Sequence, residues 1–277
     1  ERAMRLSYQT ITWGGVVGDA TGVTSIKDLF YVANGSTEQA LQDVAAAGYE
    51  GVEIFDGNLR QYEDDPAVLK KLLSDSGLEL VAVYAGANYI FKEILEDEFW
   101  RLDKSASLAA EFGARNLVVG GGSQRYDGIR ESDYDMLAEG LDRTAELAES
   151  YGLVASYHPH LTTIVEGPEQ VRKIFAKAKK IGFCPDIAHL TAGGGDAAAL
   201  VREFGDRVVY GHLKDFQPEP FAFLPLGEGT VDIAASVEAF KASVIGEWIT
   251  VELDGYAGAP IDAAKISKAY LASLGLE

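Results

Sequence analysis

Two of the chain's four histidines lie in the stretch ASYHPHLTT, at 155–163, where His158 and His160 flank a single proline. The other two are His189, in CPDIAHL, and His212, in YGHLKD. Imidazole binds transition metals as a neutral ring and transfers protons near neutral pH. A chain that uses histidine so sparingly, and places it after short apolar runs, is expected to use it for chemistry.

Carboxylates follow other apolar runs in the same way. Glu53 lies in GVEIF, Asp186 in CPDIAH and Glu252 in VELDG. Buried ionisable groups are costly without a counter-charge, so a cluster of them favours a bound cation. Two imidazoles and two carboxylates suit Mn²⁺, Co²⁺, Fe²⁺ or Zn²⁺ and contain too much nitrogen for a dedicated Mg²⁺ or Ca²⁺ site. The predicted metal ligands are His158, Asp186, His212 and Glu252.

The elements that would position these residues are short apolar runs that alternate with helical patterns. GLELVAVYAG and EWITVELDG are almost continuously apolar, as expected for strands with both faces covered. Strands are predicted at 5–11, 51–55, 78–85, 114–120, 153–158, 182–186, 208–212 and 248–253. Helices are predicted after the N-cap Thr37, from Pro66, and at 92–112, 131–151, 167–179, 197–204, 231–242 and 260–274.

Eight strand–helix pairs in 277 residues predict an α/β fold, a (β/α)8 TIM barrel that forms one domain over 1–277. A doubly wound open sheet is the alternative, but no glycine-rich dinucleotide turn follows the first strand. The long connection at 14–34 is expected to cover one end of the barrel. Helices are expected to end at Gly48, Gly77, Gly113, Gly152 and Gly275. Because TIM-barrel sites lie at the carboxyl ends of the strands, the polar residues there should meet.

Further residues at the strand ends are candidates for contact with a substrate. Trp13 follows the first strand and could form a wall of the pocket or a buried aromatic lid. Lys214 follows His212, and Asp215 could be its structural partner. The candidates for substrate binding are Trp13, Glu53, His160, His189 and Lys214.

Composition limits the possible partners. The net charge is −19, from 43 acidic and 24 basic residues, and such a field repels nucleic acid and anionic membranes. No apolar run approaches the ~20 residues of a membrane helix, and the start lacks the apolar segment of a signal peptide. One cysteine, Cys184, permits no intrachain disulfide and fits the cytoplasm. A small-molecule substrate is therefore the expected partner, with neither nucleic acid nor a membrane.

One apolar segment leaves two possibilities open. FQPEPFAFLPLGEG, at 216–229, could close over a substrate or meet a neighbouring subunit. A homo-oligomer is possible by analogy with other barrels.

Several of these motifs occur together in a known superfamily. GVE at 51–53, DIAH at 186–189, GHLKD at 211–215, LGEGTVD at 226–232 and VELDG at 251–255 resemble the sugar phosphate isomerase/epimerase superfamily of xylose isomerase-like barrels. The resemblance covers nearly the whole chain. It implies one divalent metal held by Glu, Asp, His and Glu of strands 5 to 8, with His158 here in place of the first Glu. YHPHLTTIVEG, at 157–167, is most similar to YHxHxGT of the inosose dehydratases, with Thr162 in place of the glycine.

The resemblance implies a hydro-lyase that dehydrates an inosose-like keto-polyol through an enediolate, with Mn²⁺ or Co²⁺ expected and Fe²⁺ or Zn²⁺ as alternatives. The catalytic candidates are Glu252, which could double as base, His160 and His189 for proton transfer, Lys214 for an oxyanion, and Glu53 for a substrate hydroxyl or as a second acid/base. A keto-sugar isomerase/epimerase shares the first step, as does a β-eliminating lyase of 3-keto-glycosides. A non-catalytic sugar-binding barrel and a nuclease are remoter alternatives, and the acidic charge disfavours the nuclease.

Overall fold

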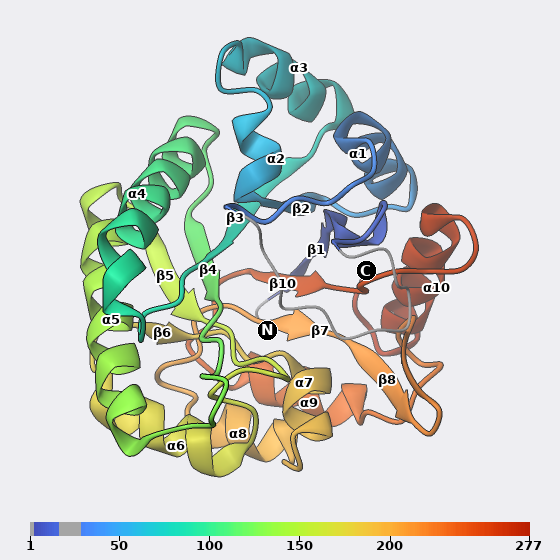
Figure 1. Ribbon diagram of the computed structural model, residues 1–277. Coiled ribbons are helices and arrows are strands. Elements are labelled where there is room, and N and C mark those ends of the chain that lie inside the picture. Colours follow the sequence, from blue (N-terminus) through green and yellow to red (C-terminus); the bar gives the residue numbers. More distant parts are fainter. Residues whose placement is uncertain (1–2, 17–28) are drawn as a thin grey trace.

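A computed structural model describes residues 3–16 and 29–277 of the chain. Eight parallel strands form one sheet in the order β6-β5-β4-β3-β2-β1-β10-β7. Parallel bridges Phe183–Val208 and Asp186–His212 join β6 to the segment of β7 and close the sheet into a barrel (Figure 1). The strands are β1 (Arg5–Gln9), β2 (Gly51–Phe55), β3 (Glu79–Gly86), β4 (Asn116–Gly120), β5 (Val154–Tyr157), β6 (Gly182–Phe183), β7 (His212–Leu213) and β10 (Trp248–Val251). The predicted TIM barrel is confirmed.

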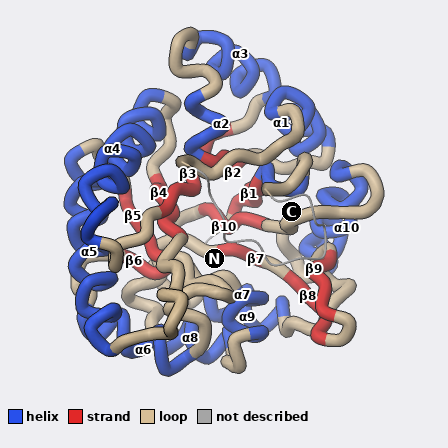
Figure 2. Tube along the Cα trace, viewed as in Figure 1, coloured by secondary structure: helices blue, strands red, loops and turns tan. Residues whose placement is uncertain are grey.

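Helices surround the strands on the outside of the barrel (Figure 2). They are α1 (Thr37–Ala46), α2 (Asp56–Arg60), α3 (Pro66–Ser76), α4 (Leu95–Glu111), α5 (Glu131–Ser150), α6 (Pro168–Lys177), α7 (Ile187–Ala192), α8 (Ala197–Glu203), α9 (Ile233–Lys241) and α10 (Pro260–Ser273). Two 3-10 turns, η1 (Thr10–Thr12) and η2 (Lys92–Ile94), complete the set. Among the described residues no helix combines the length and apolar character that a membrane span requires.

The helix ends follow the local sequence signals with one difference. Helix α3 begins at Pro66, and the glycines expected to end helices all have positive φ, as at Gly77 (68°). The N-cap of α1 is Ser36, whose hydroxyl accepts from the N–H of Gln39 at 3.1 Å, whereas Thr37 was expected there. Ser36 and Thr37 are adjacent hydroxyl residues that could both cap the helix. The hydrogen bond that the Ser36 hydroxyl accepts from the Gln39 N–H identifies Ser36 as the cap.

Two strands and two helices were not predicted. The segment 216–229 contributes to an antiparallel hairpin of β8 (Asp215–Pro218) and β9 (Phe221–Leu224), which projects beside β7 (Figure 1). Helices α2 and α7 are short turns directly after β2 and β6. The expectation for the 14–34 connection concerns mostly residues 17–28, which lie outside the described residues.

The apolar core has two parts. One lies between the strands and the helices, where residues such as Leu41, Val52 and Leu117 are buried. The other lies inside the barrel and includes Ala82 and Cys184. Because side chains alternate along a strand, inward-facing positions form layers. The layer at the carboxyl ends of the strands is polar, and it forms the site.

Candidate metal centre

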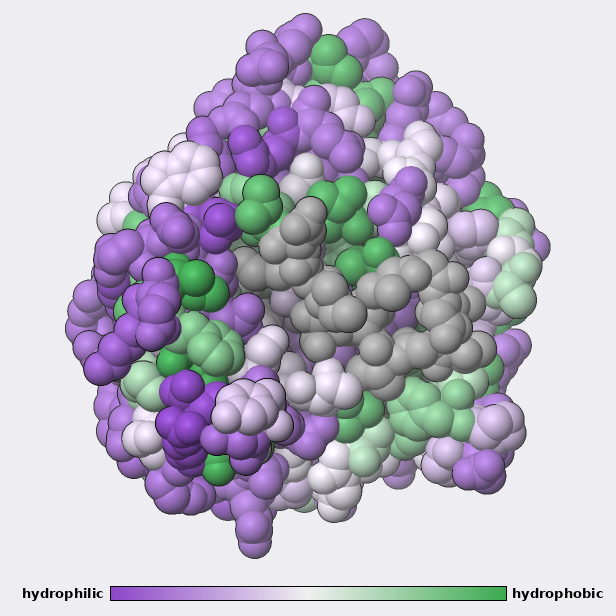
Figure 3. All heavy atoms as spheres, in the orientation of Figure 1, coloured by the Kyte–Doolittle hydropathy of each residue, from purple (hydrophilic) through white to green (hydrophobic). Residues whose placement is uncertain are grey.

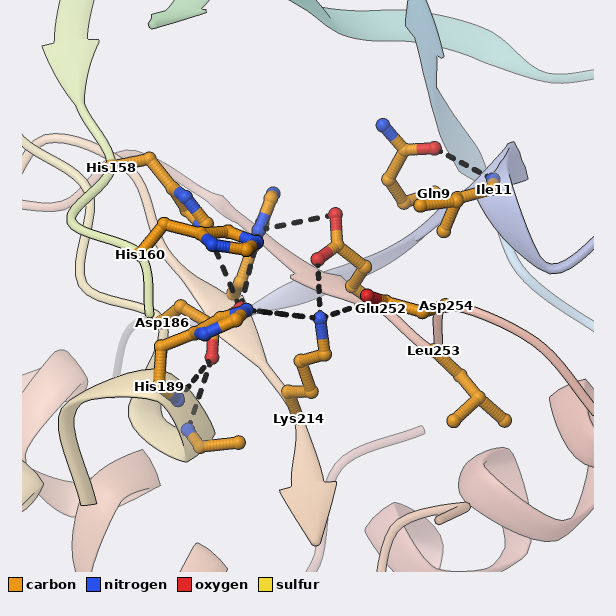
Figure 4. A network of polar contacts seen from close by, with 12 residues as sticks. Gln9, Ile11, His158, His160, Asp186, His189, Lys214, Glu252, Leu253 and Asp254 are labelled. Carbon is orange, nitrogen blue, oxygen red and sulfur yellow. Dashed lines mark hydrogen bonds and ion pairs between the residues drawn. The ribbon is translucent and has the colours of Figure 1, made fainter. Parts of the chain in front are cut away.

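Four ionisable side chains converge at the carboxyl ends of neighbouring strands. His158 follows β5, Asp186 follows β6, His212 begins β7 and Glu252 follows β10. One nitrogen or carboxylate oxygen from each residue lies within 4.8 Å of those of the other three. All four residues are buried, and Figure 4 shows three of them at this end of the barrel. The structure therefore brings together the residues that the sequence singled out as a metal site.

The two ring nitrogens of His212 have different surroundings. Nε2 lies 2.8 Å from Glu53 Oε1, and the other oxygen of Glu53 accepts from Gln9 Nε2 at 2.9 Å. Nδ1 lies 3.5 Å from Glu252 Oε2 and 3.9 Å from Asp186 Oδ2, and it is buried with no hydrogen-bond partner among the described residues. Burial by itself lowers the pKa of His212, but the carboxylates of Glu53 and Glu252 raise it to about 9.

His158 and Asp186 are each fixed by hydrogen bonds to one of their two polar side-chain atoms. His158 Nε2 lies 3.3 Å from Asp186 Oδ2, and its Nδ1 lies 3.2 Å from the hydroxyl of Tyr84. Asp186 caps α7, because its Oδ1 accepts from the backbone N–H groups of Ala188 and His189 at 3.0 Å. Burial by itself raises the pKa of Asp186, but the neighbouring His189, Lys214 and His158 side chains hold it well below its usual range.

Glu252 is oriented by a buried ammonium group. Lys214 Nζ donates to Glu252 Oε1 at 2.9 Å and also to Asp254 (Figure 4). It lies 4.2 Å from the ring centre of Phe223. Burial by itself lowers the pKa of Lys214, but the Asp254 and Glu252 carboxylates raise it above its usual value. Burial raises the pKa of Asp254 to about 6 although Lys214 opposes this.

The donor atoms have the spacing that one small cation requires. Metal–ligand bonds of about 2.1 Å place the ligand atoms of a tetrahedral site about 3.4 Å apart. Two separations at this centre, 3.3 Å from His158 to Asp186 and 3.5 Å from His212 to Glu252, agree with that value. A third, 3.9 Å from His212 to Asp186, is longer, and all four donor atoms lie within 4.8 Å of one another. The unpartnered Nδ1 of His212 is one of these atoms. The residues therefore fit a divalent ion with nitrogen and oxygen ligands, and the opposite atom of each ligand is already held.

His160 and His189 lie beside the four residues, and both contact the backbone of Leu161. Their ring centres are 3.8 Å apart. His160 Nδ1 lies 2.6 Å from the Leu161 carbonyl oxygen, so it must carry the proton of that hydrogen bond. The Leu161 N–H donates to His189 Nδ1 at 3.2 Å, and Lys214 Nζ lies 3.4 Å from His189 Nε2. Both nitrogens of His189 therefore face hydrogen-bond donors.

Both of these rings are neutral at ordinary pH. Burial, reinforced by His158 and Lys214, lowers the pKa of His160 to about 3. Burial and the neighbouring His160 lower the pKa of His189 well below its usual value. In its tautomer His160 presents an unprotonated Nε2.

A hollow of about 380 Å³ lies over this end of the barrel. One part of its described lining is mainly apolar and consists of Ile11, Val16, Tyr31, Phe55 and Tyr84. Its polar lining consists of His160, Glu252 and Asp254. Figure 3 shows hydrophobic residues gathered at the mouth of this end of the molecule.

A model of the xylose isomerase-like TIM barrel family matches residues 41–274. The chain belongs to this family. The match covers β2 to α10 and thus includes all four residues of the candidate centre. The superfamily expected from the motifs is confirmed.

Relatives within and beyond this family agree in fold. An inosose dehydratase of Geobacillus kaustophilus (strain HTA426) is 25% identical over 268 residues, which cover 84% of this chain and 86% of that protein. A structure of the IOLI protein with a bound zinc atom shares 17% identity and a TM-score of 0.76 over 98% of each chain. A fusion of a xylose isomerase-like TIM barrel with 4-hydroxyphenylpyruvate dioxygenase is 20% identical with a TM-score of 0.76. The matched part is 98% of this chain but only 43% of the fusion protein.

Four residues expected at the substrate are not among the described lining residues of the hollow: Trp13, Glu53, His189 and Lys214. Trp13 is 5% exposed and points away from the hollow. Its Nε1 donates to Asp43 at 2.9 Å. The 3-10 turn that follows β1 directs Trp13 toward α1. Glu53 lies behind His212 with both oxygens bonded, and Lys214 is enclosed by its carboxylate partners. Neither Glu53 nor Lys214 is among the described lining residues of the hollow.

Other site residues were missed in the sequence. Tyr84 lies two residues after Ala82 near the end of β3, and Phe55 lies two residues after Glu53 at the end of β2. Because every second side chain of a strand has the same direction, this spacing indicated that both rings face inward. Asp254 follows Glu252 by two residues and gave the same signal. Tyr31 gave none, because it belongs to no strand.

Proposed function

We propose that this chain is a divalent-metal-dependent hydro-lyase that removes water from a cyclic keto-polyol of the inosose class. The observation that carries the proposal is the set of four donor atoms at metal-ligand spacing, one of them the unpartnered Nδ1 of His212. The similarity over most of its length to an enzyme named inosose dehydratase supports the choice of substrate.

We assign the metal to His158, Asp186, His212 and Glu252. Mn²⁺ or Co²⁺ suits two nitrogen and two oxygen ligands, and Fe²⁺ or Zn²⁺ is compatible with them. The IOLI protein of the same fold binds zinc. When bound, the ion would supply a Lewis acid for the carbonyl group of the substrate.

His160 is the proposed proton acceptor. Its Nε2 is unprotonated because Nδ1 donates to Leu161, and the residue lines the hollow. The proton adjacent to a carbonyl group is the one removed in this step. After it accepts this proton, the imidazolium of His160 is the proposed donor to the departing hydroxyl group, which leaves as water. The proposed reaction breaks one C–H and one C–O bond, forms one C=C and one O–H bond, and adds no other reactant.

The remaining charged residues have supporting roles in this proposal. Both oxygens of Glu252 are engaged, one by Lys214 and one by the candidate centre, so it serves better as a ligand than as a base. Lys214 holds Glu252 and Asp254 in place. Glu53 orients His212 and increases its basicity as a ligand.

The same first step would serve a keto-sugar isomerase or epimerase, or a β-eliminating lyase of 3-keto-glycosides. These reactions differ from dehydration in the fate of the carbanion. An isomerase or epimerase returns the proton, whereas the lyase expels an alkoxide in place of hydroxide. The similarity over most of its length to an inosose dehydratase favours dehydration among these reactions.

The test is a reaction of Mn²⁺- or Co²⁺-loaded protein with scyllo-inosose in deuterated water, followed by proton NMR and mass spectrometry. Loss of water to a dione is the expected result. Deuterium uptake beside the carbonyl without loss of water would replace the proposal with the isomerase or epimerase reaction. No reaction with this compound would refute the substrate assignment, and keto-glycosides would then be tested.

A further inference from the structure

We infer that Tyr31, Phe55 and Tyr84 form an aromatic wall that binds the C–H face of a six-membered ring whose hydroxyl groups are equatorial. This inference rests on the proposed function and specifies its substrate class. The aromatic wall would select among keto-polyols by ring shape and configuration. Pyranose rings with equatorial hydroxyl groups would bind in the same way.

The three rings of the aromatic wall contact one another. Ring centres are 5.6 Å apart for Tyr31 and Phe55, which are stacked, and 5.2 Å for Tyr31 and Tyr84, which meet edge to face. The Phe55 and Tyr84 centres are 5.6 Å apart. All three residues are nearly buried and line the hollow. Mutual contact fixes their ring planes, which a surface that discriminates shape requires.

Tyr31 is brought to the wall by a clamp of side chains from α2. Its N–H donates to Asp56 at 3.0 Å, and its carbonyl accepts from the Gly57 N–H at 2.9 Å. Two residues later, Ala33 exchanges two hydrogen bonds with the side chain of Asn58, at 2.8 and 3.1 Å. The segment around Tyr31 is therefore held at both ends, although it belongs to no strand.

Neighbouring strands leave room for the wall by using glycine. A Cβ atom at Gly86 would lie 2.8 Å from the ring of Tyr31. A Cβ atom at Gly120 would lie 2.1 Å from the Tyr84 hydroxyl. Any other residue at these two positions would displace a ring of the wall, so the site is built around these rings.

The wall and the polar groups occupy different parts of the barrel mouth. Phe55 and Tyr84 come from β2 and β3, whereas the candidate metal ligands come from β5, β6, β7 and β10. The two parts meet where the Tyr84 hydroxyl contacts His158. A ring lying on the wall therefore has one edge at the candidate centre and at His160.

This arrangement matches one class of ring. Equatorial hydroxyl groups lie at the edge of a six-membered ring and leave C–H groups on both faces. The edge can reach the polar groups while one face contacts the aromatic rings. An axial hydroxyl group would be buried against carbon without a partner and would weaken binding by about 10- to 100-fold.

The test uses unreactive ring compounds, so that it is independent of turnover. The probes are scyllo-inositol, with every hydroxyl equatorial, and chiro-inositol, with an axial hydroxyl on each face. Both are bound to the Zn²⁺-loaded, full-length protein, since Zn²⁺ is diamagnetic, and saturation-transfer NMR is recorded with irradiation of aromatic protons. We expect strong transfer to scyllo-inositol and at least tenfold weaker binding of chiro-inositol.

Two variants locate the effect. Tyr31→Leu and Phe55→Leu should each reduce the transfer and weaken scyllo-inositol binding by about 3- to 10-fold, with folding checked by near-UV circular dichroism. Tyr126→Leu, at a fully exposed tyrosine, is the matched control and should equal the wild type. Equal binding of the two inositols, or unchanged binding in both variants, would overturn the inference.

The two proposals can fail separately. Dehydration of scyllo-inosose without aromatic transfer to either inositol removes the inference and leaves the function. Aromatic transfer that depends on Tyr31, in a protein that dehydrates no keto-polyol, supports the inference and removes the function.

Discussion

At the scale of single residues, the site depends on atoms that face away from the candidate metal. His212 is held through Nε2 by Glu53, and His158 through Nδ1 by Tyr84. Such contacts fix the ring orientation and the tautomer, so that the opposite nitrogen is presented to a metal. The orientation of the ligands is therefore built into the protein before any ion binds.

Glu53→Gln tests this orientation. The amide keeps the shape but removes the negative charge beside His212, so we expect Mn²⁺ affinity to fall by about 10- to 100-fold. Isothermal titration calorimetry measures the affinity. Glu98→Gln, at a buried carboxylate on α4, is the matched control and should bind Mn²⁺ like the wild type. An unchanged affinity in Glu53→Gln would show that His212 needs no such support.

His160→Gln tests the proposed proton acceptor. Glutamine occupies a similar volume but cannot take up a proton, so kcat should fall by about 10²- to 10⁴-fold. Metal content should stay at the wild-type value because the four proposed ligands are intact. Steady-state kinetics with scyllo-inosose and elemental analysis give the two readouts. Wild-type kcat in this variant would assign the proton transfer to another group.

The sequence indicated which residues form the candidate metal centre, but not which side chains the neighbouring residues contact. His158, Asp186, His212 and Glu252 were recognisable because each follows an apolar run and strand ends meet in a barrel. Glu53 and Trp13 have the same pattern, yet the sequence cannot show that Glu53 bonds His212 or that a 3-10 turn directs Trp13 to Asp43. Those contacts depend on distances between segments far apart in the chain.

At the scale of elements, Asp215 attaches the β8–β9 hairpin to the barrel. Its carboxylate accepts from four backbone N–H groups, those of Phe216, Gly227, Gly229 and Val231, at 2.9–3.0 Å. The expected pairing with Lys214 is not what holds it. The hairpin in turn carries Phe223, which covers the ammonium group of Lys214. One carboxylate thus connects a surface element to the site.

Asp215→Ala should loosen the hairpin. Four N–H groups would lose a charged acceptor, so we expect a loss of about 3 kcal/mol in the free energy of unfolding. Urea denaturation measures this, and limited proteolysis should cut faster between 216 and 230. Asp232→Ala, which removes the exposed N-cap of α9, is the control and should cost about 1 kcal/mol without the new cleavage. Equal effects of the two changes would contradict the proposed attachment.

Elements with a clear local sequence pattern were predicted, and elements without one were missed. The strands of the barrel were found because buried parallel strands are almost continuously apolar. The hairpin was missed because Pro218 and Pro220 interrupt its pattern, and prolines argue against a strand. Helix α7 was missed because it has only six residues, too few for a helical period to show.

At the scale of the whole molecule, the closed barrel combines a large apolar core with a polar layer at one end. Two carboxylates and two imidazoles in that layer are buried together. Lys214 and the hydrogen bonds around them compensate part of their charge, and a cation would compensate more. Stability should therefore depend on metal.

Added Mn²⁺ should raise the melting temperature. An ion at about 100 times its Kd contributes about 2.7 kcal/mol, which corresponds to about 5–10 °C in a protein of this size. Differential scanning calorimetry with Mn²⁺ and with EDTA measures the shift. The Asp186→Asn variant should show almost no shift. A shift of equal size in that variant would place the stabilising ion elsewhere.

The central claim is that four residues from β5, β6, β7 and β10 hold one divalent ion, and Mn²⁺ titration followed by electron paramagnetic resonance tests it most directly. The free-ion signal should stay suppressed until one equivalent is bound by the wild type. His212→Ala should release that equivalent, while His189→Ala, which leaves the four residues intact, should retain it. Binding of one Mn²⁺ by His212→Ala with wild-type affinity would contradict the account.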